Sequence, residues 1–289
     1  MKTIILAGGN GTRLYPLTAT TNKHFLQVYN KPMIYYSMSL SLLAGSRDIL
    51  LICRECDLDN FQKLFGDGSH LGIRVKYSVQ KKPNGLPEAL IIGKDYLDGD
   101  ECQLILGDNI LYGNNLHEIL TPPERDACKI LCYPTYDPGS FGIISFDANE
   151  KPINITEKPV GLNFGYAVPG VYYFPGDACE IASTLNKSSR GELEIADLLT
   201  HYLKKERLQC SKLGRGIAWM DAGTPQGILN ASNFIQTLET NQNMMIGCLE
   251  ELAFRKNFIT RRELEKLILS MPSGEYQNYL KRIKDHETY

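Results

Sequence analysis

The sequence lacks any long apolar run. The first such run, Ile4 to Ala7, ends at two glycines and is too short for the apolar stretch of a signal peptide. No segment approaches the ~18 consecutive apolar residues that a membrane span requires. We therefore expect a soluble protein that makes no membrane contact and works in the cytoplasm.

The sequence also lacks a strong charge of one sign. Lysine plus arginine number 31 and aspartate plus glutamate 33, which gives a net charge of −2. This balance argues against a protein that coats nucleic acid or an acidic membrane surface, so an anionic ligand would have to be met by a few local cations. Apolar residues form 43% of the 289 residues, which is ample for a core, and the length predicts one large α/β domain with an appendage or two domains.

The eight cysteines are not accompanied by a secretion signal, and we interpret them as reduced thiols. Cys53 and Cys56 form one close pair, and Cys128 and Cys132 form another, so a four-thiolate zinc site is conceivable. The second pair lies in an apolar run, where cysteine usually acts as a small hydrophobic residue. The pattern therefore favours buried structural thiols.

The first half of the chain alternates strand-like and helix-like segments, as in a sheet with crossover helices. The expected strands are residues 3–7, 48–53, 74–79 and 103–106, and the expected helices are residues 32–44, 58–64 and 87–96. Ligands of such sheets bind beyond the carboxyl ends of the strands. The loops after Ala7, Val79 and Leu106 are therefore the first places to look for a site.

The second half is first rich in strands and then helical. The expected strands are residues 129–133, 141–146, 153–157 and 166–174, followed by a strand pair at 208–213 and 217–220. The expected helices are residues 177–185 and 192–205, and from residue 224 the chain looks helical to its end. We expect a core domain over residues 1–240 and a helical carboxyl-terminal extension over residues 241–289.

The strongest local signal is a glycine-rich segment after the first strand, which holds Gly8, Gly9 and Gly11 and then Arg13. Such glycines let the backbone approach an anion, so that amide groups can hold phosphate oxygens. The segment has neither the ending of a P-loop nor the spacing of a dinucleotide fingerprint. Arg13 adds a planar cation suited to a triphosphate, and Lys23 offers a second one. A glycine turn beside a surface arginine is the plainer alternative.

Two aspartates stand where strand-like segments end, Asp108 after residues 103–106 and Asp221 after residues 217–220. Two carboxylates that meet from separate strands suit Mg²⁺, which binds one or two carboxylates together with water and substrate phosphates. The alternative is that each aspartate only caps the element after it. His24, beside Lys23, is interpreted as a structural residue, because a phosphate nucleophile needs no general base.

These motifs together resemble those of the sugar-1-phosphate nucleotidylyltransferases, and most closely the short glucose-1-phosphate thymidylyltransferases. The likeness runs along essentially the whole chain, including Ala253-Phe254-Arg255-Lys256 in the tail. The other motifs that carry it are Lys31-Pro32-Met33-Ile34-Tyr35-Tyr36, Leu106-Gly107-Asp108-Asn109-Ile110, Glu157-Lys158-Pro159, Arg190-Gly191-Glu192-Leu193-Glu194 and Trp219-Met220-Asp221.

The resemblance implies a Rossmann-like three-layer α/β nucleotidyltransferase fold with a central mixed, mostly parallel sheet. It implies the Mg²⁺-dependent condensation of dTTP with α-D-glucose 1-phosphate to dTDP-glucose and pyrophosphate, the first step of dTDP-deoxysugar synthesis of the dTDP-rhamnose type. It also implies a homotetramer with a regulatory nucleotide site at a subunit interface.

The resemblance implies the following residue roles. The triphosphate would be held by Gly8, Gly9, Gly11, Thr12, Arg13 and Lys23, and the base edge would be read by Gln80 and Gly85. The sugar phosphate would be bound by Gly142, Glu157, Lys158, Val168, Tyr172 and Glu192. The metal would be held by Asp108 and Asp221, and these two aspartates with Arg13 and Lys23 would form the catalytic set.

The chain departs from the family pattern at several positions near the expected pockets. The family usually has proline at Gln27, alanine-glutamine at Pro87-Glu88, tyrosine at Phe141 and threonine at Ala222. Uridylyl or cytidylyl transfer to another sugar 1-phosphate therefore remains an alternative, since one methyl group separates thymine from uracil. A regulatory subunit without catalysis is a second alternative, and such a protein would be expected to lose Arg13, Lys23 or one aspartate.

Overall fold

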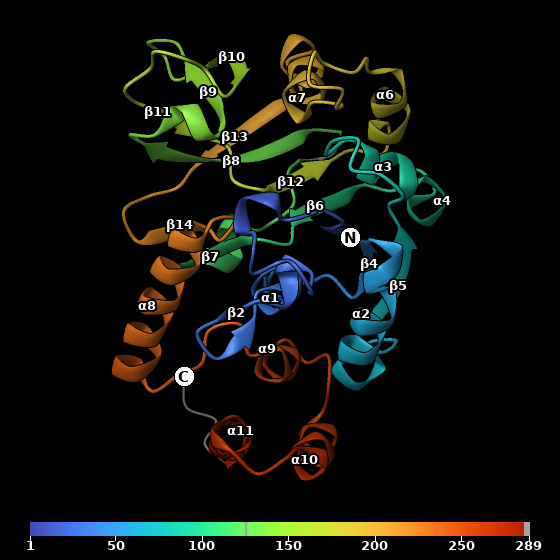
Figure 1. The fold of residues 1–289 in the computed structure, drawn as a ribbon, viewed down its shortest axis with the longest axis vertical. Helices are drawn as coiled ribbons and strands as arrows, with labels where there is room; N and C mark the ends of the chain where they lie inside the picture. The colour runs from blue at the N-terminus through green and yellow to red at the C-terminus, as the bar shows by residue number, and fades with distance from the viewer. Residues whose placement is uncertain (125, 286–289) are drawn as a thin grey trace.

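The structure is a computed structural model that describes residues 1–124 and 126–285 (Figure 1). One large sheet has the strand order β10-β9-β11-β8-β12-β6-β1-β4-β5, and β13 pairs with β8 beside this path. From β6 to β5 the strands are all parallel. These parallel strands are β1 (Lys2–Ala7), β4 (Asp48–Cys53), β5 (Arg74–Val79) and β6 (Cys102–Leu106).

The other half of the sheet is antiparallel except for the β13–β8 pair. Its strands are β8 (Cys128–Thr135), β9 (Gly142–Phe146), β10 (Pro152–Glu157), β11 (Gly165–Ala167), β12 (Val171–Phe174) and β13 (Leu208–Lys212). Two small sheets lie apart from it, formed by β14 (Ile217–Asp221) with β7 (Asn109–Gly113) and by β2 (Gln27–Val28) with β3 (Lys31–Pro32).

Helices cover both faces of the large sheet, because β1 and its neighbours are apolar on both sides. Ile5 packs in one core with Met38, and Ile4 packs in a second core with Leu90. The first face carries α1 (Ile34–Leu43), α2 (Leu58–Phe65) and α5 (Leu116–Ile119). The second face carries α3 (Glu88–Ile92), α4 (Lys94–Leu97), α6 (Ala178–Thr184) and α7 (Ile195–Lys204). This mixed sheet between two helical layers confirms the expected fold class.

From α8 to residue 285 the chain is helical, as expected, and residues 286–289 lie outside the described residues. The helices are α8 (Pro225–Gln242), α9 (Leu249–Arg255), α10 (Arg261–Ser270) and α11 (Glu275–Asp285). Figure 1 shows the last three at the end of the molecule beyond α1. Leu264 and Tyr279 belong to the same core as Met38, so these helices extend the first layer. The expected boundary between residues 240 and 241 falls inside α8.

Short 3-10 turns complete the fold. They are η1 (Thr12–Leu14), η2 (Lys23–Phe25), η3 (Glu55–Asp57), η4 (Ser69–Leu71) and η5 (Pro138–Ser140). No helix within residues 1–124 and 126–285 is long and apolar enough to cross a bilayer.

Three helices differ from their expected limits by two residues or more, or are divided. The helix expected from residue 32 begins at Ile34, because Pro32 pairs in β3. The helix expected over 87–96 is divided at Gly93, which packs so closely on β1 that an added Cβ would lie 2.6 Å from the Ile4 side chain. The helix expected from residue 192 begins at Ile195, which leaves Glu192 in the preceding loop.

Two expected strand arrangements were wrong. The single strand over residues 166–174 is two strands, because Pro169 has no N–H for a ladder and Gly170 instead donates its N–H to Asn109 Oδ1 at 2.8 Å. The strands expected to pair over 208–213 and 217–220 do not pair with each other. β13 pairs with β8 and β14 pairs with β7.

The cysteine pairs lie in different parts of the sheet. Cys53 ends β4, whereas Cys128 and Cys132 lie in β8, and the strands β12, β6 and β1 stand between them. With ~4.8 Å between neighbouring strands, the two pairs are too far apart to share one zinc ion. All eight cysteines are free thiols.

Candidate active site

The two aspartates are brought together by the pairing of β14 with β7. Asp108 stands in the turn between β6 and β7, and the antiparallel register places Asp221 opposite Asn109. The N–H of Ala222 donates to the carbonyl oxygen of Asp108 at 3.1 Å, which ties the two backbones together. Residues far apart in the sequence thus place two carboxylates at one edge of the sheet.

Each aspartate has a cation beside it. Lys23 Nζ donates a hydrogen bond to Asp108 Oδ2, and Arg13 Nη1 lies 3.8 Å from Asp221 Oδ2. Burial favours a higher pKa for Asp108, but the ammonium of Lys23 outweighs it and holds the pKa below its usual range. Burial raises the pKa of Asp221, and the negative charge of Asp108 raises it further. The positive charge of Arg13 opposes this rise only in part. The pair is therefore a concentration of negative charge that attracts cations.

Lys23 is positioned by a buried network around the turn η2. The side-chain oxygen of Asn22 accepts from the His24 backbone N–H at 2.9 Å and lies 2.6 Å from His24 Nδ1. The Asn22 amide group donates to Asp57 at 2.6 Å and to the carbonyl oxygen of Ala7 at 3.2 Å. Burial, and then the charge of Lys23, lower the pKa of His24 to about 3. A neutral, buried His24 agrees with its interpretation as a structural residue.

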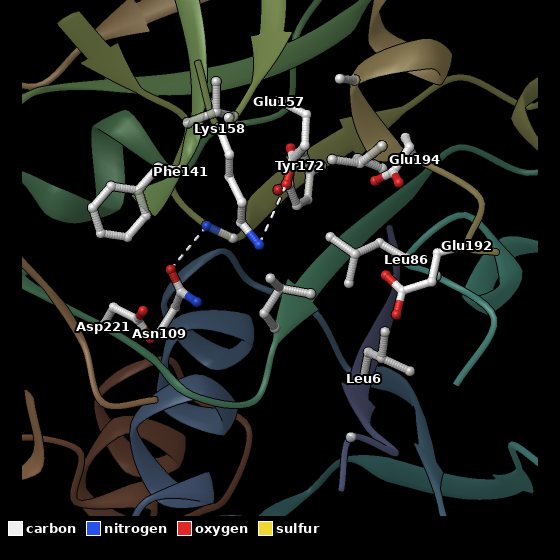
Figure 2. A pocket seen from close by; sticks show the side chains of 18 of the residues that line it. Leu6, Leu86, Asn109, Phe141, Glu157, Lys158, Tyr172, Glu192, Glu194 and Asp221 are labelled. Carbon is white, nitrogen blue, oxygen red and sulfur yellow. Dashed lines mark hydrogen bonds and ion pairs between the residues drawn. The ribbon is translucent and has the colours of Figure 1, made fainter. Parts of the chain in front are cut away.

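A cavity of about 350 Å³ opens between the parallel and antiparallel halves of the sheet. Twelve of the residues expected in the site line it, which are Gly9, Arg13, Gln80, Gly85, Asp108, Gly142, Glu157, Lys158, Val168, Tyr172, Glu192 and Asp221. Figure 2 shows Asp221 and Phe141 on one side of this cavity and Leu6, Leu86 and Glu192 on the other. Gly8, Gly11, Thr12 and Lys23 are not in this lining, but they lie in or beside the glycine loop at its edge.

The glycine loop is closely packed against its neighbours. A Cβ on Gly8 would lie 2.2 Å from Gln80 Oε1, and one on Gly11 would lie 2.9 Å from Thr18 Cγ2. Gly11 also has a φ of +63°, a conformation that residues with a side chain rarely adopt. Glycine at position 8 thus allows the close approach of the Gln80 side chain, and glycine at position 11 allows the left-handed backbone conformation.

Lys158 lies on the wall of the cavity across from Asp221 (Figure 2). Its φ is 44°, in the left-handed region, and its N–H donates to the carbonyl oxygen of Phe141 at 3.0 Å. Its Nζ lies 3.8 Å from Glu157 Oε1, and Figure 2 shows the side chain reaching over the cavity toward Asn109. Phe141 packs edge-on against Trp219 at a ring distance of 4.8 Å, so an apolar wall replaces the phenol usual in the family.

Two further residues of the cavity were not assigned a role from the sequence. Arg190 donates to Glu194 at 2.6 Å and to Glu157 at 3.3 Å, and Asn109 Oδ1 accepts from both Trp219 Nε1 at 2.7 Å and the N–H of Gly170. Arg190 lies in the motif Arg190-Gly191-Glu192-Leu193-Glu194 named above, and this motif is the sequence signal that could have identified it. Asn109 follows Asp108 directly, and only the tertiary structure reveals that it joins β7, β12 and β14.

The comparisons with known proteins agree with this geometry. The nucleotidyl transferase family profile matches residues 2–237. The chain belongs to this family. The relatives include a glucose-1-phosphate thymidylyltransferase of Neisseria meningitidis, 43% identical over 98% of this chain and 99% of the relative. Another enzyme of that name from Mycobacterium tuberculosis is 41% identical over 97% of this chain and 98% of the relative.

Solved structures show the same fold. A Bacillus anthracis protein described as a glucose-1-phosphate thymidylyltransferase, in complex with a sucrose, has a TM-score of 0.74 and 35% identity, over 81% of this chain and 94% of that chain. A UDP-glucose pyrophosphorylase complexed with UDP-glucose has a TM-score of 0.70 at 21% identity, over 82% of this chain and 98% of that chain. The second likeness concerns the fold alone.

Proposed function

We propose that the protein transfers a thymidylyl group from dTTP to α-D-glucose 1-phosphate, giving dTDP-glucose and pyrophosphate. The named relatives support the substrate pair. The observation that carries the proposal is the charge arrangement of one cavity. Asp108, Asp221 and Arg13 line one wall, with Lys23 bonded to Asp108, while Lys158 lines the opposite wall.

In this proposal the cations bring two repelling anions together. Arg13 and Lys23 bind the triphosphate of the nucleotide, and Lys158 binds the phosphate of the sugar. An oxygen of the sugar phosphate then attacks the α-phosphorus in line with the departing pyrophosphate. Holding the reactants in this geometry can supply ~7–11 kcal/mol of the barrier. Fixed cations that meet the charge on the leaving group lower the barrier further, without a covalent intermediate.

Asp108 and Asp221 fit a divalent metal, which we take to be Mg²⁺. They are two oxygen ligands from adjacent strands, and burial with mutual repulsion already raises the pKa of Asp221. Two carboxylates leave the other positions of the metal's coordination shell to substrate phosphates and water. When bound, Mg²⁺ stabilises negative charge on phosphoryl oxygens.

The other residues that the sequence predicts for the site are assigned roles from their positions in and around the cavity. The backbone of Gly8, Gly9, Gly11 and Thr12 would hold phosphate oxygens, and Gln80 and Gly85 would read the base. The sugar phosphate would lie against Gly142, Glu157, Val168, Tyr172 and Glu192, with Arg190 added to this set because it bonds to Glu157 inside the same cavity.

The direct test is pyrophosphate release across four nucleoside triphosphates and several sugar 1-phosphates, with and without a chelator. We expect dTTP with glucose 1-phosphate to give the highest kcat/KM and the chelator to abolish release. Preference for another pair would replace the named substrates, and release in the presence of chelator would contradict the metal assignment. No release with any pair would favour a non-catalytic regulatory subunit.

We also propose that residues 241–289 form a regulatory and oligomer-forming extension in a homotetramer. This proposal is supported by the family resemblance of the tail and by a second cavity of about 560 Å³ between α1, β7, α9 and α11, lined by His117, Arg255 and Tyr279 among others. Sedimentation at micromolar concentration should give a tetramer, and a monomer would contradict it.

A further inference from the structure

We propose that Asn22 and Asp57 are positioning residues of the reaction, because a buried chain of hydrogen bonds through them sets where the ammonium group of Lys23 lies. The inference rests on the proposed function, in which Lys23 binds the triphosphate. Asn22 and Asp57 are 1% and 5% exposed, and neither residue lines the cavity. They can therefore act on a substrate only through the residues that they hold.

Asn22 joins two parts of the site. Its Nδ2 donates to the carbonyl oxygen of Ala7 at 3.2 Å, and Ala7 is the last residue of β1, directly before Gly8. Its Oδ1 accepts from the N–H of His24 at 2.9 Å, which caps the turn η2 that begins at Lys23. One amide group therefore ties the start of the glycine-rich segment to the backbone around Lys23.

Asp57 determines which way this amide faces. Asn22 Nδ2 donates to Asp57 Oδ2 at 2.6 Å, and a carboxylate paired with arginine can only accept, so the oxygen end of the Asn22 amide must face His24. Arg54 holds Asp57 with two bonds, from Nε to Oδ2 at 2.6 Å and from Nη2 to Oδ1 at 3.1 Å. Since Asn22 Oδ1 can only accept, the proton of the neutral His24 ring is on Nδ1, 2.6 Å away.

The ring of His24 fills the space behind Lys23. With its proton on Nδ1, Nε2 is a bare nitrogen, and it has no hydrogen-bond partner among the described residues. The ring lies against Gly107, where an added Cβ would be 2.5 Å from Nε2. Gly107 directly precedes Asp108, which accepts a hydrogen bond from Lys23 Nζ. The packed ring therefore limits how far the turn η2 can move Lys23 relative to Asp108.

Lys23 needs this support because its ammonium group is at the end of a flexible side chain. The side chain runs along the glycine-rich segment, since a Cβ on Gly11 would lie 3.3 Å from Lys23 Cβ and a Cβ on Gly9 would lie 3.8 Å from Lys23 Nζ. The ammonium thus lies beside Gly9, where we propose that the triphosphate binds. A shift of the turn η2 would move it away, and misplacing a group by about 1 Å can lower a rate about a hundredfold.

The two positioning residues can be exchanged, which gives a sharp test. In Asn22→Asp, a carboxylate oxygen would face Asp57 Oδ2 where an N–H now donates, so two negative acceptors would repel each other. Adding Asp57→Asn reverses the bond, because the new asparagine donates to the new aspartate. The exchange keeps the net charge and both contacts to His24. It loses the bond to Ala7 and one of the two bonds from Arg54.

The experiment measures kcat/KM for dTTP and the dissociation constant of dTTP by calorimetry, with melting temperatures to establish that each variant is folded. Asn22→Asp should lower kcat/KM for dTTP by at least about tenfold and leave the KM for glucose 1-phosphate nearly unchanged. Asn22→Asp with Asp57→Asn should recover to within about threefold of the wild-type value. The matched control is Asn233→Asp, an exposed asparagine of α8, which should change neither quantity.

A merely structural role is separated by repeating Asn22→Asp in a Lys23→Met protein. If Asn22 acts through Lys23, the substitution should cost less than about twofold once the ammonium is absent. A residue that only stabilises the fold would lower kcat/KM equally in both backgrounds. Arg54→Met is a milder second variant at the partly exposed end of the chain, and we expect about a threefold loss that also disappears in Lys23→Met.

Wild-type kcat/KM in folded Asn22→Asp, failure of the exchange to restore it, or an equal loss with and without Lys23 would each overturn the inference. If Asn22→Asp does not fold, Arg54→Met decides by the same comparison. Absence of turnover in the wild-type protein would instead overturn the proposed function. The dissociation constants of dTTP and of inorganic tripolyphosphate across the same variants would then still decide the role of Asn22, and a wild-type protein that binds neither would overturn both.

Discussion

The two walls of the cavity hold their cations differently. On the nucleotide wall, the side chains of Lys23 and Asp108 are 15% and 10% exposed and a buried network fixes Lys23, whereas the side chain of Arg13 is 58% exposed. On the sugar wall, the side chains of Lys158 and Arg190 are 49% and 42% exposed, and their carboxylate partners are on loops or strand ends. Lys23 and Asp108 are thus arranged before substrate arrives, whereas Arg13 and the cations of the sugar wall must lose side-chain freedom when the phosphates bind.

The largest expected effect is on the arranged wall. Asp108→Asn should lower kcat by at least about a hundredfold, because it removes a negative charge that orients Lys23 and would hold the metal. Arg13→Ala should fall in the same range, because Arg13 is proposed to meet the charge that develops on the departing pyrophosphate in the transition state, where a fixed cation contributes most. Steady-state pyrophosphate release checks both, with Asp95→Asn on the exposed face of α4 as the matched control. Near-normal turnover in Asp108→Asn and Arg13→Ala would remove the catalytic assignments.

A smaller effect is expected on the exposed side chains of the sugar wall. Lys158→Met should raise the KM for glucose 1-phosphate about tenfold and leave the KM for dTTP nearly unchanged, because an exposed cation contributes about 1.4 kcal/mol or less. The two KM values, measured with the other substrate saturating, separate the walls. An equal rise in both KM values would show that the comparison between the walls is wrong.

A separate effect, on stability rather than on turnover, concerns the buried network beneath Lys23. The pKa of His24 is lowered from 6.5 to about 3, so between these values the unfolded chain binds a proton that the folded chain does not. Stability is therefore full above pH 6.5 and falls as pH decreases toward 3, by at most about 1.4 kcal/mol per pH unit from this group.

The measurement is the melting temperature of the wild-type protein and of His24→Gln between pH 7 and pH 4. We expect a shallower decline in the variant, whatever its absolute stability. Parallel declines would mean that His24 is not the group responsible. His201→Gln on α7 is a control, since this histidine lies away from the network.

The parallel half of the sheet could be predicted from the sequence, because each of its strands is a short apolar run with a turn after it. Residues 48–53 and 74–79 match β4 and β5 to the residue. The antiparallel half could not be predicted as well, since its pairing depends on distant partners. No local pattern indicates that Ile217–Asp221 pairs with Asn109–Gly113.

The active site, like the sheet, could be predicted from the sequence only in part. The strand-end positions of Asp108 and Asp221 predicted candidate ligands, but the strand pairing that brings them together is a tertiary feature. Arg190 belonged to a quoted motif and received no role, because its partner Glu157 lies on β10, far away in the sequence. The hydrogen bond from Lys187 Nζ to Asn84 Oδ1 likewise depends on the loop after α6 meeting the loop before α3.

The central claim is that Asp108 and Asp221 together hold the metal beside the nucleotide. The most direct measurement is the Mg²⁺ concentration that gives half-maximal pyrophosphate release in the wild-type protein and in Asp221→Asn. The claim predicts no release without Mg²⁺ and at least about a tenfold higher half-saturating concentration in the variant, as a lost ligand costs about 1.4 kcal/mol or more. An Asp221→Asn protein with the wild-type Mg²⁺ dependence would contradict it.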